Sequence, residues 1–441
     1  MENAASLRLS LLLCWPALSA TAATVEIGPG ADVRAAIAAL RAGDELVLRG
    51  GTYSFNSRFG VTAVGTAAQP IVVRGKSGET AVIDMTTVNQ NIIDVENSAY
   101  FVLRNLTFHG GSAGVRLVQS SYITIEDSEI YGTDDVGISA NSGNYEGLLI
   151  RHNHIHNTGA TGEGMYLGCN NNACRVLNSV IEWNYIHDTN GPTVTQGDGI
   201  EVKEGSAGNI IRHNVIHDTG YPGIITYSTV GNGGPNIIDS NVIWNAGDYA
   251  IQSAADSIIR NNIVLGTIGM QPHQAGSPSN QIVANNTIIC DSDCVQIRGV
   301  SGSVVFANNA VYANAGSAID LISGNLSLVT LAGNVVAGGV AGATGGFVNG
   351  NGIAADFVNG NFNGAPPIDL FPKASSALIG AGTTQYVTDL DFNGTTRSGS
   401  RDAGAYKYQA GGNPGWTLAA SFKAMSANTT VPNPPTALTT Q

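Results

Sequence analysis

Residues 198–220 have the sequence DGIEVKEGSAGNIIRHNVIHDTG, which contains three short apolar segments, GIEV, NIIRHN and VIHD. Their apolar residues alternate or stand in pairs, and Gly, Asn, Asp and Ser separate them. Such segments predict short strands joined by turns. Three strands within so short a stretch are typical of one coil of a parallel β-helix.

An asparagine marks the same position in each repeat of this pattern. Neighbouring members of the series are 21 to 31 residues apart, and Ser128 fills the one step that lacks an asparagine. The asparagines are Asn105, Asn153, Asn184, Asn214, Asn241, Asn262, Asn286, Asn309 and Asn334. Repeats of this length indicate a solenoid, and because buried amides need partners, we expect the asparagines to stack as a ladder.

The sequence therefore predicts an all-β fold, a right-handed parallel β-helix with three strands per coil. The natural twist of β-strands favours this hand. Apolar residues of successive coils should form inner columns, one of which is Ile138, Met165, Ile200, Ile224 and Ile251. Asp32 as N-cap and Gly43 as stop signal predict a capping helix that covers the open N-terminal end of the coils.

Composition divides the chain into four parts. Residues 1–23 place Arg8 before an apolar run and a group of small residues, as in a secretory signal peptide. Residues 24–345 carry the repeat and its N-terminal cap, whereas residues 346–408 lose the repeat and are expected to close the coils. Residues 409–441 are rich in Gly, Pro, Thr and Asn, which predicts a flexible tail.

Only 12% of the residues are charged, and the formal net charge is −13. No run of Lys and Arg interrupts this acidity, which argues against nucleic acid and anionic membrane as partners. After the signal, no segment is long and apolar enough to span a bilayer. Because capped ends would prevent end-to-end association, we expect a monomer.

Five cysteines bear on the compartment. Cys14 lies in the apolar run of the signal, and lipid attachment there is the alternative, although the residue before it is large for that processing. The others form two close pairs, Cys169 with Cys174 and Cys290 with Cys294, which predict two local disulfides in a secreted or periplasmic protein. A zinc site of four cysteines is the alternative, but the pairs lie several coils apart.

Charged and aromatic residues gather on the outer side of the strand that begins at Ile200. Because coils stack about 4.8 Å apart, equivalent outward residues form rows along the axis. One row is Arg116, Ser139, Tyr166, Glu201, Ile225 and Gln252, and the next is Asn141, Gly168, Lys203, Tyr227 and Ala254. The carboxylates that precede these strands are Asp134, Asp135, Glu163 and Asp198. Long loops at 169–178 and 188–198 flank the rows, which predicts a binding face with aromatic rings suited to sugars.

This group of residues fits a calcium site beside a general base. Calcium takes about six to eight oxygen ligands. The residues able to supply them are Asp188, Asp198, Glu201 and Glu163. A cation on a uronate carboxylate would acidify the adjacent proton, and Lys203, once neutral, would accept it. The structural alternative is a salt bridge between Glu201 and Lys203, two residues apart on one strand.

Two further rows lie elsewhere on the predicted coils. The first row is His156, His187 and His217, each followed by Asn or Asp. It fits a metal or acid–base role, and the alternative is a turn in which these side chains bond the backbone. The second row is Arg151, Arg212 and Arg260. We expect these arginines to be solvated and to lie on a different face from Lys203.

Residues 183–209, WNYIHDTNGPTVTQGDGIEVKEGSAGN, resemble the active-site stretch of the family 9 pectate lyases. Those enzymes are right-handed β-helices in which an aspartate is followed, after a loop, by an Asp-Gly-apolar-x-x-Lys motif and a turn with Gly and Asn. Asp188, the motif from Asp198 to Lys203, and Asn209 match that order. The resemblance implies that Lys203 is the proton-abstracting base and that Asp188 and Asp198 lie near calcium.

A second resemblance concerns residues 389–408, DLDFNGTTRSGSRDAGAYKY. This stretch is similar to a closing segment of many secreted bacterial β-helix proteins. The similarity implies that the stretch caps the C-terminal end of the coils.

The leading hypothesis is a secreted polysaccharide lyase that cleaves a polyuronate by β-elimination with calcium as cofactor. Lys203 is then the base, and Tyr166 or Tyr227 protonates the leaving oxygen. The expected substrate contacts are Glu163, Glu201, His187 and His217, and the expected metal ligands are Asp188, Asp198 and Glu201. A C5-epimerase would begin with the same proton abstraction.

Two other classes stay open. A glycoside hydrolase would use a pair of carboxyls as acid and base, held apart by neighbouring coils. The candidates for that pair are Glu163, Asp198, Glu201 and Asp135. A non-catalytic carbohydrate-binding surface protein would use the coils as a rigid rod for display.

Overall fold

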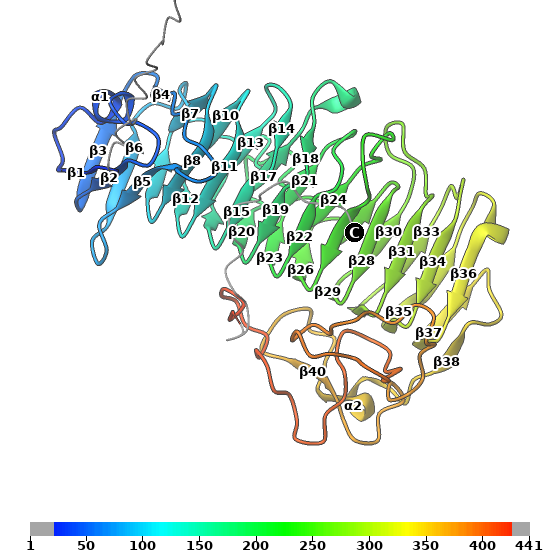
Figure 1. The fold of residues 1–441 in the computed structure, drawn as a ribbon. Coiled ribbons are helices and arrows are strands. Elements are labelled where there is room, and N and C mark those ends of the chain that lie inside the picture. Colours follow the sequence, from blue (N-terminus) through cyan, green and yellow to red (C-terminus); the bar gives the residue numbers. More distant parts are fainter. Residues whose placement is uncertain (1–21, 426–441) are drawn as a thin grey trace, which may run out of the picture.

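The structure, a computed structural model, describes residues 22–425 and forms an elongated stack of parallel β-strands (Figure 1). Each coil contributes strands to three faces that run along the stack. The first face has 13 strands. The prediction of an all-β parallel β-helix with three-stranded coils is confirmed.

The three faces hold most of the strands. The first face contains β1 (Thr24–Ile27), β2 (Glu45–Leu48), β5 (Ile71–Gly75), β8 (Ala99–Arg104), β11 (Ser121–Glu126), β15 (Leu149–Arg151), β19 (Val180–Glu182), β22 (Ile210–Arg212), β25 (Asn236–Asp239), β28 (Ser257–Arg260), β31 (Gln281–Ala284), β34 (Val304–Ala307) and β36 (Val329–Ala332). The second face contains β3 (Gly51–Phe55), β6 (Ala81–Met85), β9 (Thr107–Gly110), β12 (Glu129–Tyr131), β16 (His154–His156), β20 (Tyr185–Thr189), β23 (Val215–Thr219), β26 (Val242–Ala246), β29 (Ile263–Leu265), β32 (Thr287–Cys290), β35 (Ala310–Leu321), β37 (Asn334–Ala341) and β38 (Phe347–Asn349). The third face contains β4 (Gly60–Val61), β7 (Ile93–Glu96), β10 (Val115–Val118), β13 (Ile138–Ala140), β17 (Met165–Leu167), β21 (Ile200–Val202), β24 (Ile224–Thr226), β27 (Ile251–Ser253), β30 (Ile268–Met270), β33 (Val295–Ile297) and the end of β35. The remaining elements are the pair β14 (Tyr145–Glu146) and β18 (Val176–Leu177), the antiparallel pair β39 (Phe357–Asn359) and β40 (Asp369–Pro372), α1 (Val33–Ala38), α2 (Ile353–Asp356), η1 (Asn170–Asn172) and η2 (Leu326–Leu328).

The inner side of the third face confirms the predicted apolar column. Its members pair across successive coils in the order Ile138, Met165, Ile200, Ile224 and Ile251. All of them are fully buried in one continuous core. Burying an Ile or Met side chain contributes about 1.5–3 kcal/mol, so such columns account for much of the stability of the coils.

The asparagine ladder is confirmed from Asn153 to Asn334. Asn214 is typical, because its amide donates to Ile181 O of the preceding coil at 3.0 Å and to Asn241 Oδ1 of the next coil at 2.9 Å. These asparagine side chains are fully buried. Leaving one such group without a partner would cost about 1–3 kcal/mol, which explains why the amide recurs at every turn.

The prediction is wrong for Asn105, which lies one residue before the ladder position. Leu106 holds that position instead, and its backbone N–H donates to Ser128 Oγ at 3.2 Å, which confirms Ser128 as a member. Asn105 adopts a left-handed backbone conformation with φ 52°, as Asn261 and Asn285 do just before their own ladder residues. Asparagine suits this conformation better than most residues, so the same residue type marks two neighbouring positions for different reasons.

The N-terminal cap has the predicted start and an earlier end. The Asp32 carboxylate accepts a hydrogen bond from Ala35 N at 3.0 Å, as an N-cap does. The helix stops at Ala38, and Gly43 adopts φ 92° in the turn that follows. Val33 and Ile37 are buried in the same core as the coils, so the helix covers the apolar interior of the first coil.

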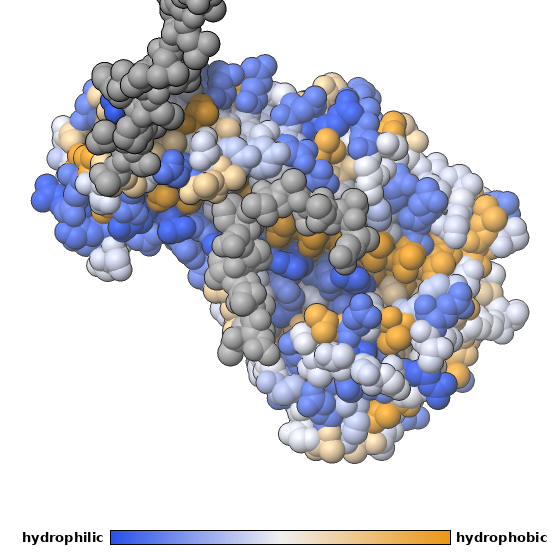
Figure 2. Space-filling model, in the orientation of Figure 1, coloured by the Kyte–Doolittle hydropathy of each residue, from blue (hydrophilic) through white to orange (hydrophobic). Residues whose placement is uncertain are grey.

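The C-terminal segment packs along the side of the coils, which corrects the expectation that residues 389–408 cap their end. It forms a lobe beside β35 and β37, with polar and apolar residues mixed on its surface (Figures 1 and 2). Phe371, Phe392 and Tyr406 share an apolar cluster with outward residues of the second face. Arg397 is buried inside the lobe and donates to Gly404 O at 2.8 Å. The last strand of the coils, β38, ends at residue 349, four residues past the predicted limit.

Residues 409–425, predicted to belong to a flexible tail, lie against the coils. Leu418 and Lys423 are buried, and Lys423 Nζ lies 3.0 Å from His213 Nδ1. Apolar contact with the second face and hydrogen bonds to the first face hold this segment, although its composition lacks periodicity. Residues 1–21, and with them most of the predicted signal peptide, lie outside the described residues, as do residues 426–441. Among residues 22–425, no helix combines the length and apolarity needed to cross a bilayer.

Candidate active site

The outer side of the third face carries the two predicted rows. Strand pairing places Arg116, Ser139, Tyr166, Glu201, Ile225 and Gln252 at equivalent positions of successive coils. Lys203 and Tyr227 follow their strands by one residue, and their backbone N–H groups donate to Leu167 O at 2.8 Å and to Val202 O at 3.2 Å. Both side chains therefore extend on the side of Tyr166 and Glu201.

Lys203 is held by one carboxylate and two aromatic rings. Its Nζ donates to Glu201 Oε1 and lies 4.5 Å from the ring centre of Tyr166 and 5.1 Å from that of Tyr227. Cations over aromatic faces are stabilised by the ring quadrupole. Tyr227 also donates from its hydroxyl to Glu201 Oε1 at 2.8 Å. The salt bridge considered above is thus present, and it fixes the position of the amine.

Three carboxylates meet beside Lys203, and we call Glu163, Asp198 and Glu201 the acidic cluster. One oxygen of each lies within 4.8 Å of the others. The exposed fractions of these three residues are 0%, 3% and 2%, so the cluster is covered. This corrects the prediction that it faces solvent. Neither oxygen of Glu163, nor Glu201 Oε2, accepts a hydrogen bond from any described residue.

The electrostatics of the acidic cluster follow from this burial. Burial, with the neighbouring carboxylates of Glu201 and Glu163, raises the pKa of Asp198 to about 8. Burial also raises the pKa of Glu163. Buried like charges oppose ionisation unless a cation balances them. Orphaned carboxylate oxygens in a group of three are the ligand type that calcium takes, so the acidic cluster fits a calcium ion.

A loop from a later coil covers the other side of Lys203. His273, between β30 and β31, lies with Nε2 3.1 Å from the Tyr227 hydroxyl, and Ala275 N donates to Glu204 Oε1 at 3.2 Å. Burial and the charge of Lys203 lower the pKa of His273, which is thus neutral at pH 7. Gln274 donates to Asn170 at 3.0 Å, in the loop that the Cys169–Cys174 disulfide closes.

Sequence reasoning missed His273 and the buried Glu204. The signal was present, since the stretch QPHQAGSPSN interrupts the repeat after β30 just as the two recognised loops do. Both predicted disulfides are present, Cys169 with Cys174 and Cys290 with Cys294.

Asp188 does not join the acidic cluster, which corrects its assignment beside Asp198. Its carboxylate Oδ2 lies 2.8 Å from His187 Nδ1 on the second face. Asp188 belongs to β20, whereas Asp198 precedes β21, and the loop between them crosses from the second face to the third. Of the four residues predicted to supply calcium ligands, the other three, Glu163, Asp198 and Glu201, do lie together.

His187 and His217 also lie on the second face, apart from Lys203. Their rings stack at 5.0 Å between centres, and His217 stacks on Trp244 at 4.2 Å. The predicted histidine column is therefore real, but each ring face contacts a neighbouring ring. Burial, with the charge of His217, lowers the pKa of His187. Burial, with the neighbouring imidazoles, lowers the pKa of His154 to about 4, so both are neutral at pH 7.

The arginine row lies on the first face, as expected, but in ion pairs. The hydrogen bonds are Arg151 to Glu126 at 2.6 Å, Arg212 to Glu182 at 2.7 Å and Arg260 to Asp239 at 2.8 Å. All of these residues except Glu126 line a cleft of about 680 Å³ between the first face and the C-terminal segment. Lys203 and the acidic cluster do not line it.

Comparison with known proteins agrees with this architecture. A pectate lyase, PEL9 of Emericella nidulans, is 27% identical over 199 residues, which is 42% of this chain and 41% of that protein. The alignment thus spans less than half of that relative. Among solved structures, pectate lyase Pel9A is 16% identical with a TM-score of 0.50, covering 88% of this chain and 97% of that chain. XylC in complex with xylose is 10% identical with a TM-score of 0.53, covering 87% and 98%.

At these low sequence identities, the similarity to solved structures shows the fold alone. A family model described as "Pel9A-like, right handed beta helix region" matches residues 15–257, more than half of the chain, including the acidic cluster and Lys203. The predicted right hand of the coils is the hand of that family. The chain belongs to the Pel9A-like right-handed β-helix family.

Proposed function

We propose that this protein is a polysaccharide lyase that cleaves a uronic-acid-containing polymer by β-elimination. One observation supports the proposal above all: an amine, Lys203, is fixed on the outer side of a coil beside three buried carboxylates. Both oxygens of Glu163 and one oxygen of Glu201 accept no hydrogen bond from the described residues. Membership of the Pel9A-like family and the similarity to PEL9 of E. nidulans support it.

Glu163, Asp198 and Glu201 would hold the calcium ion that the acidic cluster fits. Bound there, calcium would neutralise the uronate carboxylate and so acidify the proton on the adjacent carbon. The chain's own contribution is to gather three acids in a site with little water, where the charge of a cation has its greatest effect.

Lys203 would accept the proton on the carbon next to the uronate carboxylate. The electron pair of that C–H bond then forms a carbon–carbon double bond, the C–O bond at the next carbon breaks, and the leaving oxygen takes a proton. Lys203 must be neutral to act as the base. The tyrosine rings on both sides limit the directions from which substrate reaches the amine.

Tyr166 is the better candidate to protonate the leaving oxygen. The hydroxyl of Tyr227 already donates to Glu201, and its side chain is buried. Tyr166 is half-buried and lies one coil away from Glu201 in the same row. Burial raises the pKa of Tyr166, which keeps its hydroxyl protonated and able to donate.

Arg116 extends the site along the axis. It lies two coils before Tyr166 in the same row, roughly 10 Å away at the usual coil spacing. Its guanidinium is partly exposed, donates to Ser142 Oγ at 2.8 Å and lies 3.9 Å from Asp94. A further uronate carboxylate of the same polymer would find its cationic partner there.

The compartment is part of the proposal. Two disulfides favour an oxidising environment, and the sequence of residues 1–23 favours export. We propose that the protein acts outside the cytoplasm on a polymer too large to enter the cell.

The test is the product formed from a panel of polyuronates. Elimination leaves an unsaturated sugar that absorbs ultraviolet light, and we expect this signal in calcium and its loss in the Lys203→Ala variant. Lys76→Ala, at a partly exposed lysine on the first face, is the matched control and should keep full activity. New reducing ends without the absorbance would mean hydrolysis, and binding without any product would mean a non-catalytic protein; either result contradicts the proposal. Inverted sugars in an uncleaved chain would point to epimerisation.

A further inference from the structure

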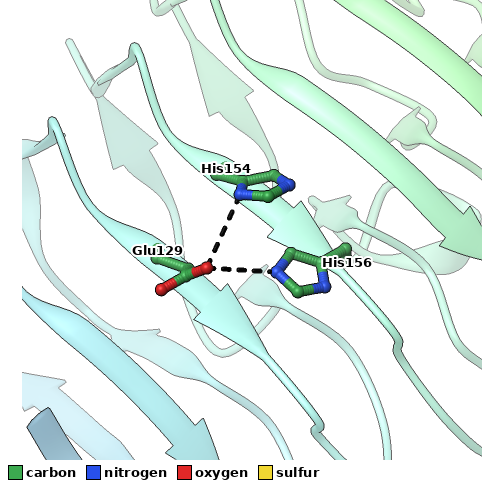
Figure 3. A group of neighbouring side chains, drawn as sticks. All are labelled: Glu129, His154 and His156. Carbon is green, nitrogen blue, oxygen red and sulfur yellow. Dashed lines mark hydrogen bonds and ion pairs between the residues drawn. The ribbon is translucent and has the colours of Figure 1, made fainter. Parts of the chain in front are cut away.

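A second group of side chains with metal-binding chemistry lies on the second face, away from the acidic cluster. Glu129 lies on β12, and His154 and His156 lie on the next strand, β16 (Figure 3). His154 is the strand partner of Glu129, and His156 stands two residues further along, so all three project from the same side. We call Glu129, His154 and His156 the histidine cluster.

The three side chains converge on one point. Glu129 Oε1 lies 3.6 Å from His154 Nδ1 and 3.3 Å from His156 Nε2 (Figure 3). All three ligand atoms lie within 4.8 Å of one another. Atoms that bind one ion at about 2.0–2.2 Å are separated by distances of this order.

Neighbouring groups fix the tautomer of each imidazole. His156 Nδ1 lies 2.7 Å from Asn157 Oδ1, so Nδ1 carries a proton, and in the neutral ring Nε2 presents its lone pair to Glu129. His187 Nδ1 donates to Asp188 in the same way, which leaves His187 Nε2 without a proton. His154 Nε2 lies 2.8 Å from His187 Nε2 and must therefore be the donor of that pair. His154 Nδ1 is then a lone pair that also faces Glu129.

This assignment leaves two nitrogen lone pairs and a carboxylate facing one another with no hydrogen between them. Such an arrangement is repulsive unless a proton or a metal ion lies at the centre, and the geometry allows either. Outer partners that orient metal-binding imidazoles are typical of metal sites. Here Asn157 contacts His156 directly, and Asp188 acts on His154 through His187. We propose that Glu129, His154 and His156 bind one divalent transition-metal ion of the zinc type.

The donor set and the access agree with this assignment. Two imidazoles and one carboxylate are ligands that zinc accepts, with a further position open to water. A cavity of about 360 Å³ adjoins the cluster and is lined by Glu129, His154 and Phe422, among others. The Glu129 and His154 side chains are 41% and 28% exposed, so an ion can enter from solvent. All described cysteines are in disulfides, so no thiolate of the described residues competes.

The test uses the full-length protein stripped with a chelator and titrated with Co²⁺ as a spectroscopic probe and Zn²⁺ as competitor. We expect one equivalent of Co²⁺ to give a visible absorption band of nitrogen and oxygen ligation that Zn²⁺ removes. His154→Gln should weaken binding at least 100-fold and abolish the band. Asp188→Asn, which removes the acceptor that fixes the tautomer of His187 and thereby that of His154, should weaken Co²⁺ binding about 10–100-fold.

His109→Gln is the matched control. Strand pairing places His109, Tyr131 and His156 at equivalent positions of successive coils, and His109 contacts Asp84 and not Glu129. It should bind as the unaltered protein does. Absence of the band, or equal affinity in His154→Gln and the unaltered protein, would overturn the proposal. Thermal unfolding of each metal-free variant checks that it folds. None of these measurements depends on lyase activity, so the metal site and the proposed function are tested independently.

Discussion

The acidic cluster and the histidine cluster lie on neighbouring faces of adjacent coils, and their crowded ligand atoms have different surroundings. In the acidic cluster, three buried carboxylates share a site with one lysine, and burial raises the pKa of Asp198 and of Glu163. In the histidine cluster, the side chains are partly exposed, burial lowers the pKa of His154 to about 4, and hydrogen-bonded neighbours orient the imidazoles. The stacking of coils therefore sets the spacing of the ligands, whereas burial and hydrogen-bonded neighbours determine which cation each cluster binds.

Of the variants considered, loss of Lys203 should have the largest effect on the rate of elimination, because only the third face is proposed to carry out chemistry. General-base catalysis contributes about 10²–10⁴-fold to a rate, so we expect Lys203→Ala to lower the rate of elimination by that factor. His154→Gln should change the rate less than twofold. Initial rates of unsaturated product, measured at saturating calcium, check both. Equal losses in the two variants would mean that the faces do not act separately.

The two clusters should also separate by metal. Replacing Glu163 by Gln removes a carboxylate with two unpartnered oxygens, and we expect it to weaken calcium binding about 10–100-fold while zinc binding is unchanged. His154→Gln should do the reverse. Isothermal titration of the chelator-treated variants with each ion checks this double difference. A variant that loses both ions would show that the two sites are coupled or that the fold has changed.

The acidic cluster should make stability depend on pH when calcium is absent. In the unfolded chain Asp198 has the ordinary aspartate pKa of 3.8, whereas burial raises the pKa of the folded group to about 8. Its contribution to stability is therefore fully present below pH 4 and is lost as the pH rises towards 8. We expect the melting temperature in EDTA to fall between pH 5 and pH 8, and to fall less in Asp198→Asn. A fall of the same size in both proteins would assign it to other groups.

The smallest expected effect concerns Arg116, at the edge of the proposed site. Because an exposed cation contributes modestly to binding, we expect Arg116→Ala to raise KM for a long polyuronate severalfold and to leave kcat nearly unchanged. Substrates too short to reach two coils from Tyr166 should not distinguish the variant from the unaltered protein. The ratio of KM values for long and short substrates, at fixed ionic strength, is the measurement.

The parts that the sequence predicted share a local cause. Side chains of period two select a face, and repeats of similar length carry that choice from coil to coil, so the apolar column of Ile200 and the row of Glu201 needed no distant information. The position of Lys203 beside Glu201 follows from the same rule, because residues that are two apart along a strand face the same side. The asparagine series was misplaced only at Asn105, where the preceding turn position also favours asparagine.

The parts that the sequence missed depend on where loops cross. Asp188 and Asp198 are close in the chain, yet the loop between them changes face, and Asp188 pairs with His187. His273 reaches Tyr227 from a later coil, through a loop that interrupts the repeat. No local pattern states how a loop of irregular sequence folds back.

By itself, the sequence determined the parallel coils, their inner columns, the ladder from Asn153 and the face that bears Lys203. These depend on periodic burial and on the need of buried amides for partners, both of which act over a few residues at a time. The tertiary structure alone decided that the acidic cluster is covered, that the C-terminal segment lies along the coils and that the histidines aim their lone pairs at Glu129. Burial, docking of a non-repeating segment and tautomer choice all depend on residues from separate coils, and only packing brings those together.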